Sequence, residues 1–393
     1  MRLLASIRAS NLLTNALYLM SSGLATSVLG YIFWIIAARL YSADIIAQVG
    51  VLMSIAGFLI ALGDMGFGIA SIRFLPGMGR KNSRKFILIV LFMNLVLTSL
   101  WYLLSIVLFT ALGKYDFLYS GQVLVIFYLF VSMHGVLYAW GSVFTGLRKN
   151  KLSLHQELIV NVGKLFLLVI IVQFTQSLES LILGGALSML CANLFGFVKL
   201  ASLLPEETLT GSEGKSPLLD IKMVAYAFKN FIGRFALDSH QYLVPIIVYG
   251  ILDAADAGVF YVCWICGIAF RLVPNACLNS LFAKLSEPKS NTRELVSSAL
   301  NLNFIILSGG LLFVFIAGEY VLSLFGGGYS ENAEVVILIG LAAVPWSLNY
   351  LVVTLARVYK RVWLINLIGL TLLFSISVLV PYFGRIYGMY GIA

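Results

Sequence analysis

The sequence of 393 residues is 61% hydrophobic and only 11% charged, with a mean hydropathy of +0.98. Soluble domains carry about 25% charged residues, so this composition excludes a soluble globular protein and predicts an integral membrane protein. The net charge of +9 does not indicate nucleic-acid binding, because the basic residues lie in short clusters between apolar runs, as they do in loops that face the cytoplasm and anionic membrane lipids.

Eleven apolar segments are each long enough to cross a hydrocarbon core of about 30 Å. The predicted spans are 14–38, 45–70, 86–112, 121–146, 154–174, 178–203, 225–251, 257–283, 297–325, 332–356 and 361–383. The start of a twelfth follows, and the sequence stops at Gly391, Ile392 and Ala393, so we expect helix twelve to be truncated. The fold class is therefore an all-α membrane protein.

The distribution of basic residues supports this arrangement of spans. With the amino terminus in the cytoplasm, 20 of the 26 Lys and Arg fall in predicted cytoplasmic segments and three fall in outer segments. Such a bias is typical of multi-pass membrane proteins, and a wrong helix count would have scrambled it.

One polar connection is long enough to separate two halves of the chain. Residues 204–220 contain Pro, Gly, Ser and Glu, which is typical of a linker, and they follow the sixth span on the cytoplasmic side. We therefore predict an N-lobe at 1–203 with helices 1–6 and a C-lobe at 221–393 with helices 7–12. Because six is an even number of spans, the two lobes would be parallel repeats.

The three remaining cations, Lys164, Arg234 and Arg271, lie inside spans. A charge near the bilayer centre costs at least about 2.5–3.5 kcal/mol, so such residues usually face a partner or a cavity. From the helical rise, all three lie roughly 14–15 Å from the cytoplasmic end, which places them in the inner half of the membrane. We expect them to line one hydrated, net-positive chamber. Two simpler readings stay open: Arg234 could form a structural ion pair, and Lys164 could extend toward the membrane surface.

Three further polar residues are candidates for coupling or gating. Asp238 lies four residues after Arg234, close enough to pair, and could carry a coupling Na⁺ or H⁺. Asp64 is flanked by glycines that permit close helix approach and is a conformational latch or a ligand. His240 is a proton relay or is simply hydrogen-bonded to a neighbouring helix. Prolines 245, 274 and 345 interrupt predicted spans and are expected bending points.

No cofactor, metal ion or disulfide is expected. The four cysteines lie within apolar segments, and Cys263 and Cys266 form a C-x-x-C pair without a second pair or a nearby ligand set. This pattern favours packing over metal binding.

Several short motifs, taken in order along the chain, resemble one family of membrane transporters. They are Ala37–Ser42, Gly63–Gly68, Ile72–Pro76, Leu324–Gly326 with Tyr329, and Val380–Gly384 with Gly388 and Gly391. With the number of spans, they resemble the oligosaccharide flippase (Wzx-like, polysaccharide transport) family of the MOP exporter superfamily.

This resemblance implies two six-helix lobes in a V around a central cavity, as in MATE-like transporters. It also implies a cargo of polyprenyl- or dolichyl-(pyro)phosphate-linked oligosaccharide, flipped across the cytoplasmic (inner) membrane by alternating access for O-antigen, capsule or exopolysaccharide synthesis. Lys164, Arg234 and Arg271 would then bind the phosphates. Membrane lipids, and a glycosyltransferase or polymerase of the same pathway, are the expected partners.

Two other classes of function stay open. A multidrug or cation antiporter of the same fold would favour an acidic cavity, and the margin of three basic residues over the acidic Asp64 and Asp238 is thin. A membrane polymerase or glycosyltransferase would need a large soluble domain or outer loop with convergent acids and bases. The outer loops here are short, so we do not expect an enzyme, and a pure scaffold would not need buried charges.

Overall fold

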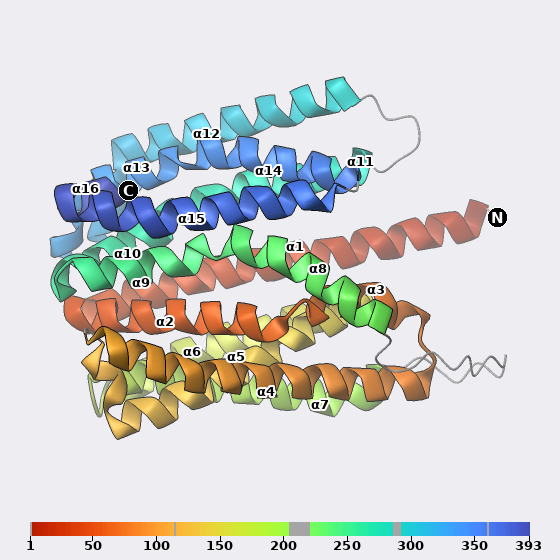
Figure 1. Ribbon diagram of the computed structural model, residues 1–393, viewed down its shortest axis with the longest axis horizontal. Helices are drawn as coiled ribbons and strands as arrows, with labels where there is room; N and C mark the ends of the chain where they lie inside the picture. Colours follow the sequence, from red (N-terminus) through yellow and green to blue (C-terminus); the bar gives the residue numbers. More distant parts are fainter. Residues whose placement is uncertain (1, 114, 204–220, 286–291, 360) are drawn as a thin grey trace. The chain divides into compact units, whose positions relative to one another are not determined.

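The computed structural model describes residues 2–113, 115–203, 221–285, 292–359 and 361–393, and these residues are almost entirely helical (Figure 1). The longer helices are α1 (Arg2–Leu40), α2 (Ala43–Asp64), α3 (Phe67–Phe74), α4 (Arg80–Leu112), α5 (Gly121–Gly146), α6 (Asn150–Ile171), α7 (Leu178–Leu203), α8 (Ile221–Asp238), α9 (His240–Ile251), α10 (Ala254–Ile268), α11 (Leu272–Leu285), α12 (Thr292–Ser323), α13 (Ala333–Leu341), α14 (Ala343–Val358) and α15 (Val362–Tyr387). Short helices are η1 (Leu75–Gly77), η2 (Asp116–Tyr119), η3 (Ala269–Arg271), η4 (Gly327–Asn332) and α16 (Met389–Ile392).

Ten helical stretches in the described part of the chain are long and apolar enough to cross a membrane. The predicted seventh span is formed by two consecutive helices, α8 and α9, of which α9 is a shorter apolar helix. The all-α membrane fold is thus confirmed, and the count of eleven spans plus the start of a twelfth stays a prediction.

The chain divides into two compact units. The first contains Met1–Phe33 and Ala56–Phe231, and the second contains Trp34–Ile55 and Ile232–Ala393. Helices α1, α2 and α8 therefore contribute residues to both units. The predicted lobes at 1–203 and 221–393 stay a prediction, and their linker at 204–220 lies outside the described residues.

The core of the first unit is built around α5. Trp140 is fully buried, stacks on Phe144 with ring centroids 5.4 Å apart, and meets Phe197 of α7 edge to face at 5.4 Å. Gly196 of α7 lies where a Cβ atom would come within 2.7 Å of the Trp140 ring. The absence of a side chain at Gly196 therefore lets α7 approach α5 closely enough to enclose the tryptophan.

Three helical segments in the second unit are interrupted at the same kind of position, three to six residues before a proline. The interruptions fall at Ser239, at Ala269–Arg271 and at Ala342, ahead of Pro245, Pro274 and Pro345. Proline removes the hydrogen bond to the carbonyl four residues earlier and clashes with it, which weakens the helix at that turn. Three predicted spans, 225–251, 257–283 and 332–356, are thus each made of two helices.

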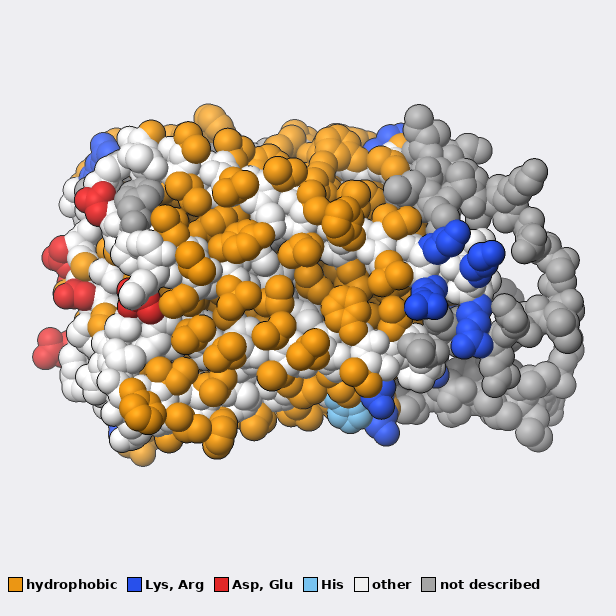
Figure 2. Space-filling view, turned by 90° about the horizontal axis from the view of Figure 1, so that it is seen from below, with side chains coloured by type: hydrophobic (Ala, Val, Ile, Leu, Met, Phe, Trp, Pro, Cys, Tyr) orange, Lys and Arg blue, Asp and Glu red, His pale blue; other side chains and the backbone are white. Residues whose placement is uncertain are grey.

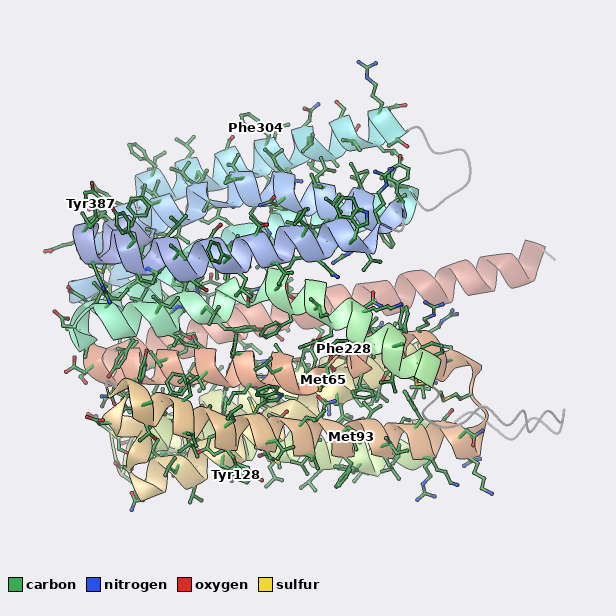
Figure 3. All side chains as sticks on the ribbon, viewed as in Figure 1. Met65, Met93, Tyr128, Phe228, Phe304 and Tyr387 are labelled. Carbon is green, nitrogen blue, oxygen red and sulfur yellow. The ribbon has the colours of Figure 1, made fainter. Side chains whose placement is uncertain are left out.

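The predicted second span, 45–70, is also not one helix. Helix α2 ends at Asp64, and the chain turns through Met65 and Gly66, which have φ values of 42° and 82°, before α3 begins. A φ of 82° is readily adopted by glycine. A Cβ atom on Gly66 would also collide with the carbonyl oxygen of Ala227 on α8. Figure 3 labels Met65 and Phe228, the chain neighbours of these two residues.

Large apolar side chains cover the outer surface of the helices. The face in Figure 2 is hydrophobic across its middle, with the visible Asp and Glu at one end and most of the visible Lys and Arg toward the other. Phe304 of α12 and Tyr387 of α15, labelled in Figure 3, are 68% and 62% exposed. Apolar surface of this extent indicates contact with lipid, and the chain is a multi-pass membrane protein.

Candidate functional site

Arg271 occupies the interruption between α10 and α11. Proline at position 274 weakens the helix here, and the guanidinium at the end of the short η3 segment lies near two tryptophans of the same unit. Its Cζ atom lies 5.6 Å from the ring centroid of Trp264 on α10 and 5.0 Å from that of Trp346 on α14. Both rings are buried, so the cation–π contacts are sheltered from water and stabilise the charge.

His240 also contacts the Arg271 guanidinium. The ring is buried, and Nδ1 lies 2.6 Å from the carbonyl oxygen of Leu237 while Nε2 meets Nη1 of Arg271. A carbonyl oxygen can only accept and a guanidinium can only donate. The two contacts therefore fit a neutral imidazole that carries its proton on Nδ1 and accepts from Arg271 at Nε2.

Arg271 and His240 belong to a polar cluster formed by residues near three of the helix interruptions. His240 begins α9 and packs on Trp346 with ring centroids 4.7 Å apart, and Nε1 of Trp346 donates to Oδ1 of Asn275 at 3.3 Å. We call His240, Trp264, Arg271, Asn275 and Trp346 the arginine cluster. Interrupted helices at membrane depth are typical of substrate sites in transporters, because they free polar groups there.

Arg271 has no carboxylate partner in the described part of the chain. Its Nε atom is buried and is without a hydrogen-bond partner among these residues. The guanidinium thus keeps an unused donor as well as an uncompensated positive charge, both of which an anion could satisfy.

Arg234 and Asp238 form an ion pair on α8. Nε of Arg234 lies 3.6 Å from Oδ2 of Asp238, and the two side chains are 47% and 41% exposed. Asp238 also interacts electrostatically with Arg357, near the end of α14. The spacing of four residues brings the pair together as expected, and a half-exposed pair of this kind contributes only a few tenths of a kcal/mol to stability.

Lys164 lies on α6 in the first unit. Its Nζ atom is 5.0 Å from the ring centroid of Phe33 on α1, and it interacts electrostatically with Glu157 two turns earlier and with His134 of α5. Glu157 lies inside the predicted fifth span and was left out when the acidic residues Asp64 and Asp238 were counted, so the margin of three basic over two acidic residues does not hold. Its position seven residues before Lys164, on the same helical face, was the signal that could have revealed it.

Asp64 closes the turn between α2 and α3. The side chain is buried, and its carboxylate accepts hydrogen bonds from the backbone N–H of Gly68 at 2.8 Å and of Gly66 at 3.2 Å. These donors would otherwise be orphaned at the start of α3, and a carboxylate there also matches the positive end of the helix dipole. The contacts favour a latch over a ligand.

The structure brings together Arg271 with His240, and Arg234 with Asp238. Lys164 belongs to the first unit and Arg271 to the second, so one chamber shared by the three cations stays a prediction. Trp264 and Trp346 were not among the residues predicted for the site from the sequence. The proline three residues after Arg271 was the available signal that this part of the span forms a site.

The family of the chain follows from a comparison with family models. The model described as "Polysaccharide biosynthesis protein" matches residues 12–263, which is more than half of the chain. The chain belongs to this family. Among proteins of curated function, none is similar enough in sequence to count as a match.

Solved transporters share the fold of this polysaccharide biosynthesis family member. A MOP superfamily transporter from Pyrococcus furiosus is similar over 97% of this chain and 91% of its own, with a TM-score of 0.63 and 11% identity. An inward-facing multidrug resistance MATE transporter is similar over 95% of this chain and 89% of its own, with a TM-score of 0.59 and 14% identity. A MATE transporter of Vibrio cholerae in the bent form is similar over 98% of this chain and 92% of its own, with a TM-score of 0.55 and 14% identity. The chain thus belongs to the polysaccharide biosynthesis family and shares its fold with MOP superfamily transporters.

Proposed function

We propose that this transporter flips a polyprenyl- or dolichyl-(pyro)phosphate-linked oligosaccharide across the cytoplasmic membrane during polysaccharide synthesis. The amino terminus lies in the cytoplasm, where the cargo is loaded. The head group passes through the protein by alternating access while the isoprenoid tail stays in the bilayer. Membership of the polysaccharide biosynthesis family supports this choice of cargo.

The observation that carries the proposal is the uncompensated charge of Arg271. The guanidinium has a free Nε donor and no carboxylate partner among the described residues, although it is surrounded by buried side chains. A phosphate is the ligand that such a group favours, since arginine presents planar donors to its oxygens. Trp264 and Trp346, which both lie near the guanidinium, add apolar faces of the kind on which sugar rings stack.

The other two cations would act as secondary contacts. Arg234 is half-exposed, so a phosphate could reach it and compete with Asp238 for the guanidinium. Lys164 offers a compact point charge in the first unit. The role of Arg234 follows from its charge and exposure, and that of Lys164 from its charge.

A multidrug or cation antiporter is the second candidate, and the similarity to multidrug resistance MATE transporters favours it. Charge alone does not exclude it, because the predicted spans also contain acidic residues. Asp64, Asp238 and Glu157 already have partners, however: Asp64 in a turn, Asp238 with Arg234, and Glu157 with Thr26. The Pyrococcus furiosus transporter is itself described by the reverse polarity of its binding pocket and a different function, so the fold alone does not set the charge of the cargo.

The test is transport by the purified protein in liposomes of a fluorescent lipid-linked oligosaccharide, with a cationic dye as the competing cargo. The proposal expects movement of the lipid-linked sugar, and its loss in Arg271→Ala at unchanged protein levels. Movement of the dye without movement of the sugar would establish the antiporter instead.

A further inference from the structure

Glu157 is a carboxylate within a membrane-spanning helix of the first unit. Its Oε2 atom accepts a hydrogen bond from Oγ1 of Thr26 on α1 at 3.0 Å, and its carboxylate also interacts with the side chain of Asn161 one turn later. Neither of these partners carries charge. A carboxylate at membrane depth is costly and is rarely present without a functional or pairing role.

The charged partner of Glu157 is Lys164, two turns further along α6. The helical rise separates the two backbones by about 10 Å on one face, and both side chains are long enough to shorten that gap. The two groups interact electrostatically while the Nζ atom of Lys164 lies against Phe33. The pair is electrically neutral when Glu157 is ionised and Lys164 is protonated. An anion bound to Lys164 then adds negative charge, which a proton on Glu157 offsets.

The helices packed against α6 bring few other charges to this pair. From α5, His134 interacts with Lys164, and its buried Nδ1 has no hydrogen-bond partner among the described residues. Helix α1 contributes the hydroxyl of Thr26. Helix α7 packs along α6 through the bond from Gln156 to the Ala192 carbonyl. The titratable groups of α7 are Glu179, Cys191 and Lys199, and none of them interacts with Glu157 in the described structure.

We propose that Glu157 binds a proton whenever the charge of Lys164 is neutralised by an anion, so that proton uptake and anion binding in the first unit are coupled. A phosphate on Lys164 removes the charge that keeps Glu157 ionised, and Glu157 then takes a proton from water on its carboxylate oxygen. By linkage, protonation of Glu157 strengthens anion binding at Lys164 by the same factor. The cargo-dependent half of this inference rests on the proposed function.

The first measurement needs no cargo. The full chain in lipid nanodiscs is titrated with acid, and the carbonyl-stretch band of protonated carboxyl groups is followed by infrared difference spectroscopy. Part of the band disappears in Glu157→Gln and is kept in the control Glu179→Gln, which alters an acid at the start of α7. In Lys164→Gln the Glu157 band appears at higher pH, because its cationic neighbour is gone. An unchanged midpoint in Lys164→Gln overturns the coupling.

The second measurement adds farnesyl diphosphate as the probe, with its affinity measured by calorimetry across a pH range. In the wild type the affinity rises on acidification by about fivefold or more beyond the change seen in Glu157→Gln, which corrects for titration of the probe itself. Equal pH dependence in the two proteins overturns the proposal, as does a dependence on Na⁺ in place of H⁺. Glu157→Asp keeps a carboxylate and retains the effect, which guards against a folding defect in the glutamine variant.

The two measurements separate this inference from the proposed function. If farnesyl diphosphate does not bind the wild type, the anionic cargo loses its support, and the anion-linked half of the inference fails with it. The infrared titration still decides whether Lys164 controls the protonation of Glu157. If the probe binds but the Glu157 band does not respond to Lys164, the cargo stands and the coupling fails.

Discussion

Nη1 of Arg271 contacts Nε2 of His240, and this contact joins the interruption of one membrane-spanning segment to the interruption of another. Because the imidazole accepts from the guanidinium, it orients the arginine without neutralising its charge. A carboxylate in the place of His240 would have consumed that charge. The arrangement therefore keeps a cation both positioned and available, which is what recognition of an anionic cargo requires.

Arg271→Ala should reduce transport of lipid-linked oligosaccharide by about 10- to 100-fold, the loss expected for a charge-assisted hydrogen bond. Arg271→Lys should recover only part of the rate, since an ammonium cannot reproduce the planar donors or the stacking on tryptophan. The control is Arg385→Ala, which removes an exposed arginine from the last turn of α15. Wild-type rates in Arg271→Ala with normal membrane levels would remove this residue from the site.

His240→Ala should lower the stability of the protein in detergent by about 1–3 kcal/mol, because it leaves the Arg271 donor buried without its acceptor. His240→Gln offers a side-chain oxygen as acceptor and should recover part of this loss. The measurement is thermal unfolding, with His155→Ala as the control on α6. A stability unaffected by His240→Ala would show that the contact with Arg271 does not hold the cluster together.

Arg234 and Asp238 should contribute little to stability as a pair, about 0.3–0.5 kcal/mol in a double-mutant cycle, since both side chains are half-exposed. If cargo displaces Asp238 from Arg234, then Asp238→Asn leaves transport active while Arg234→Ala lowers it. Equal loss in the two variants would favour a structural pair. Loss in Asp238→Asn alone, together with insensitivity to an imposed ion gradient, would assign Asp238 to coupling.

Asp64→Ala should destabilise the protein by about 0.5–2 kcal/mol, since two backbone N–H groups at the start of α3 lose their acceptor. Asp116→Ala, at an exposed position that begins η2, serves as the control. Cargo affinity should be unchanged in folded Asp64→Ala protein. A selective loss of affinity without a change in stability would instead make Asp64 a ligand.

The helical membrane fold could be predicted from the sequence because hydrophobic length and the placement of basic residues are strong, additive signals. The positions of the interruptions were less accessible. Prolines 245, 274 and 345 lie near the breaks, but the helices break three to six residues earlier, because a proline disturbs the turn that precedes it. The break after Asp64 contains no proline and depends on the backbone conformation of Gly66.

The candidate site was only partly predictable. Arg234 and Asp238 are local on one helix, so their spacing was sufficient. The contact between Arg271 and His240 joins segments 31 residues apart, and nothing in the local pattern of either segment specifies it. Glu157 was missed because a single acid in an otherwise apolar helix barely alters its hydropathy, although Lys164 shares its helical face.

The most direct test of the proposed transport is reconstitution of the purified chain with a fluorescent polyprenyl-diphosphate oligosaccharide in one leaflet. We expect the wild type to move the labelled lipid to the opposite leaflet and Arg271→Ala to fail to do so, while Arg385→Ala behaves as the wild type. Movement that is equally fast in wild type and Arg271→Ala, or no movement of the lipid alongside export of a cationic dye, would contradict it.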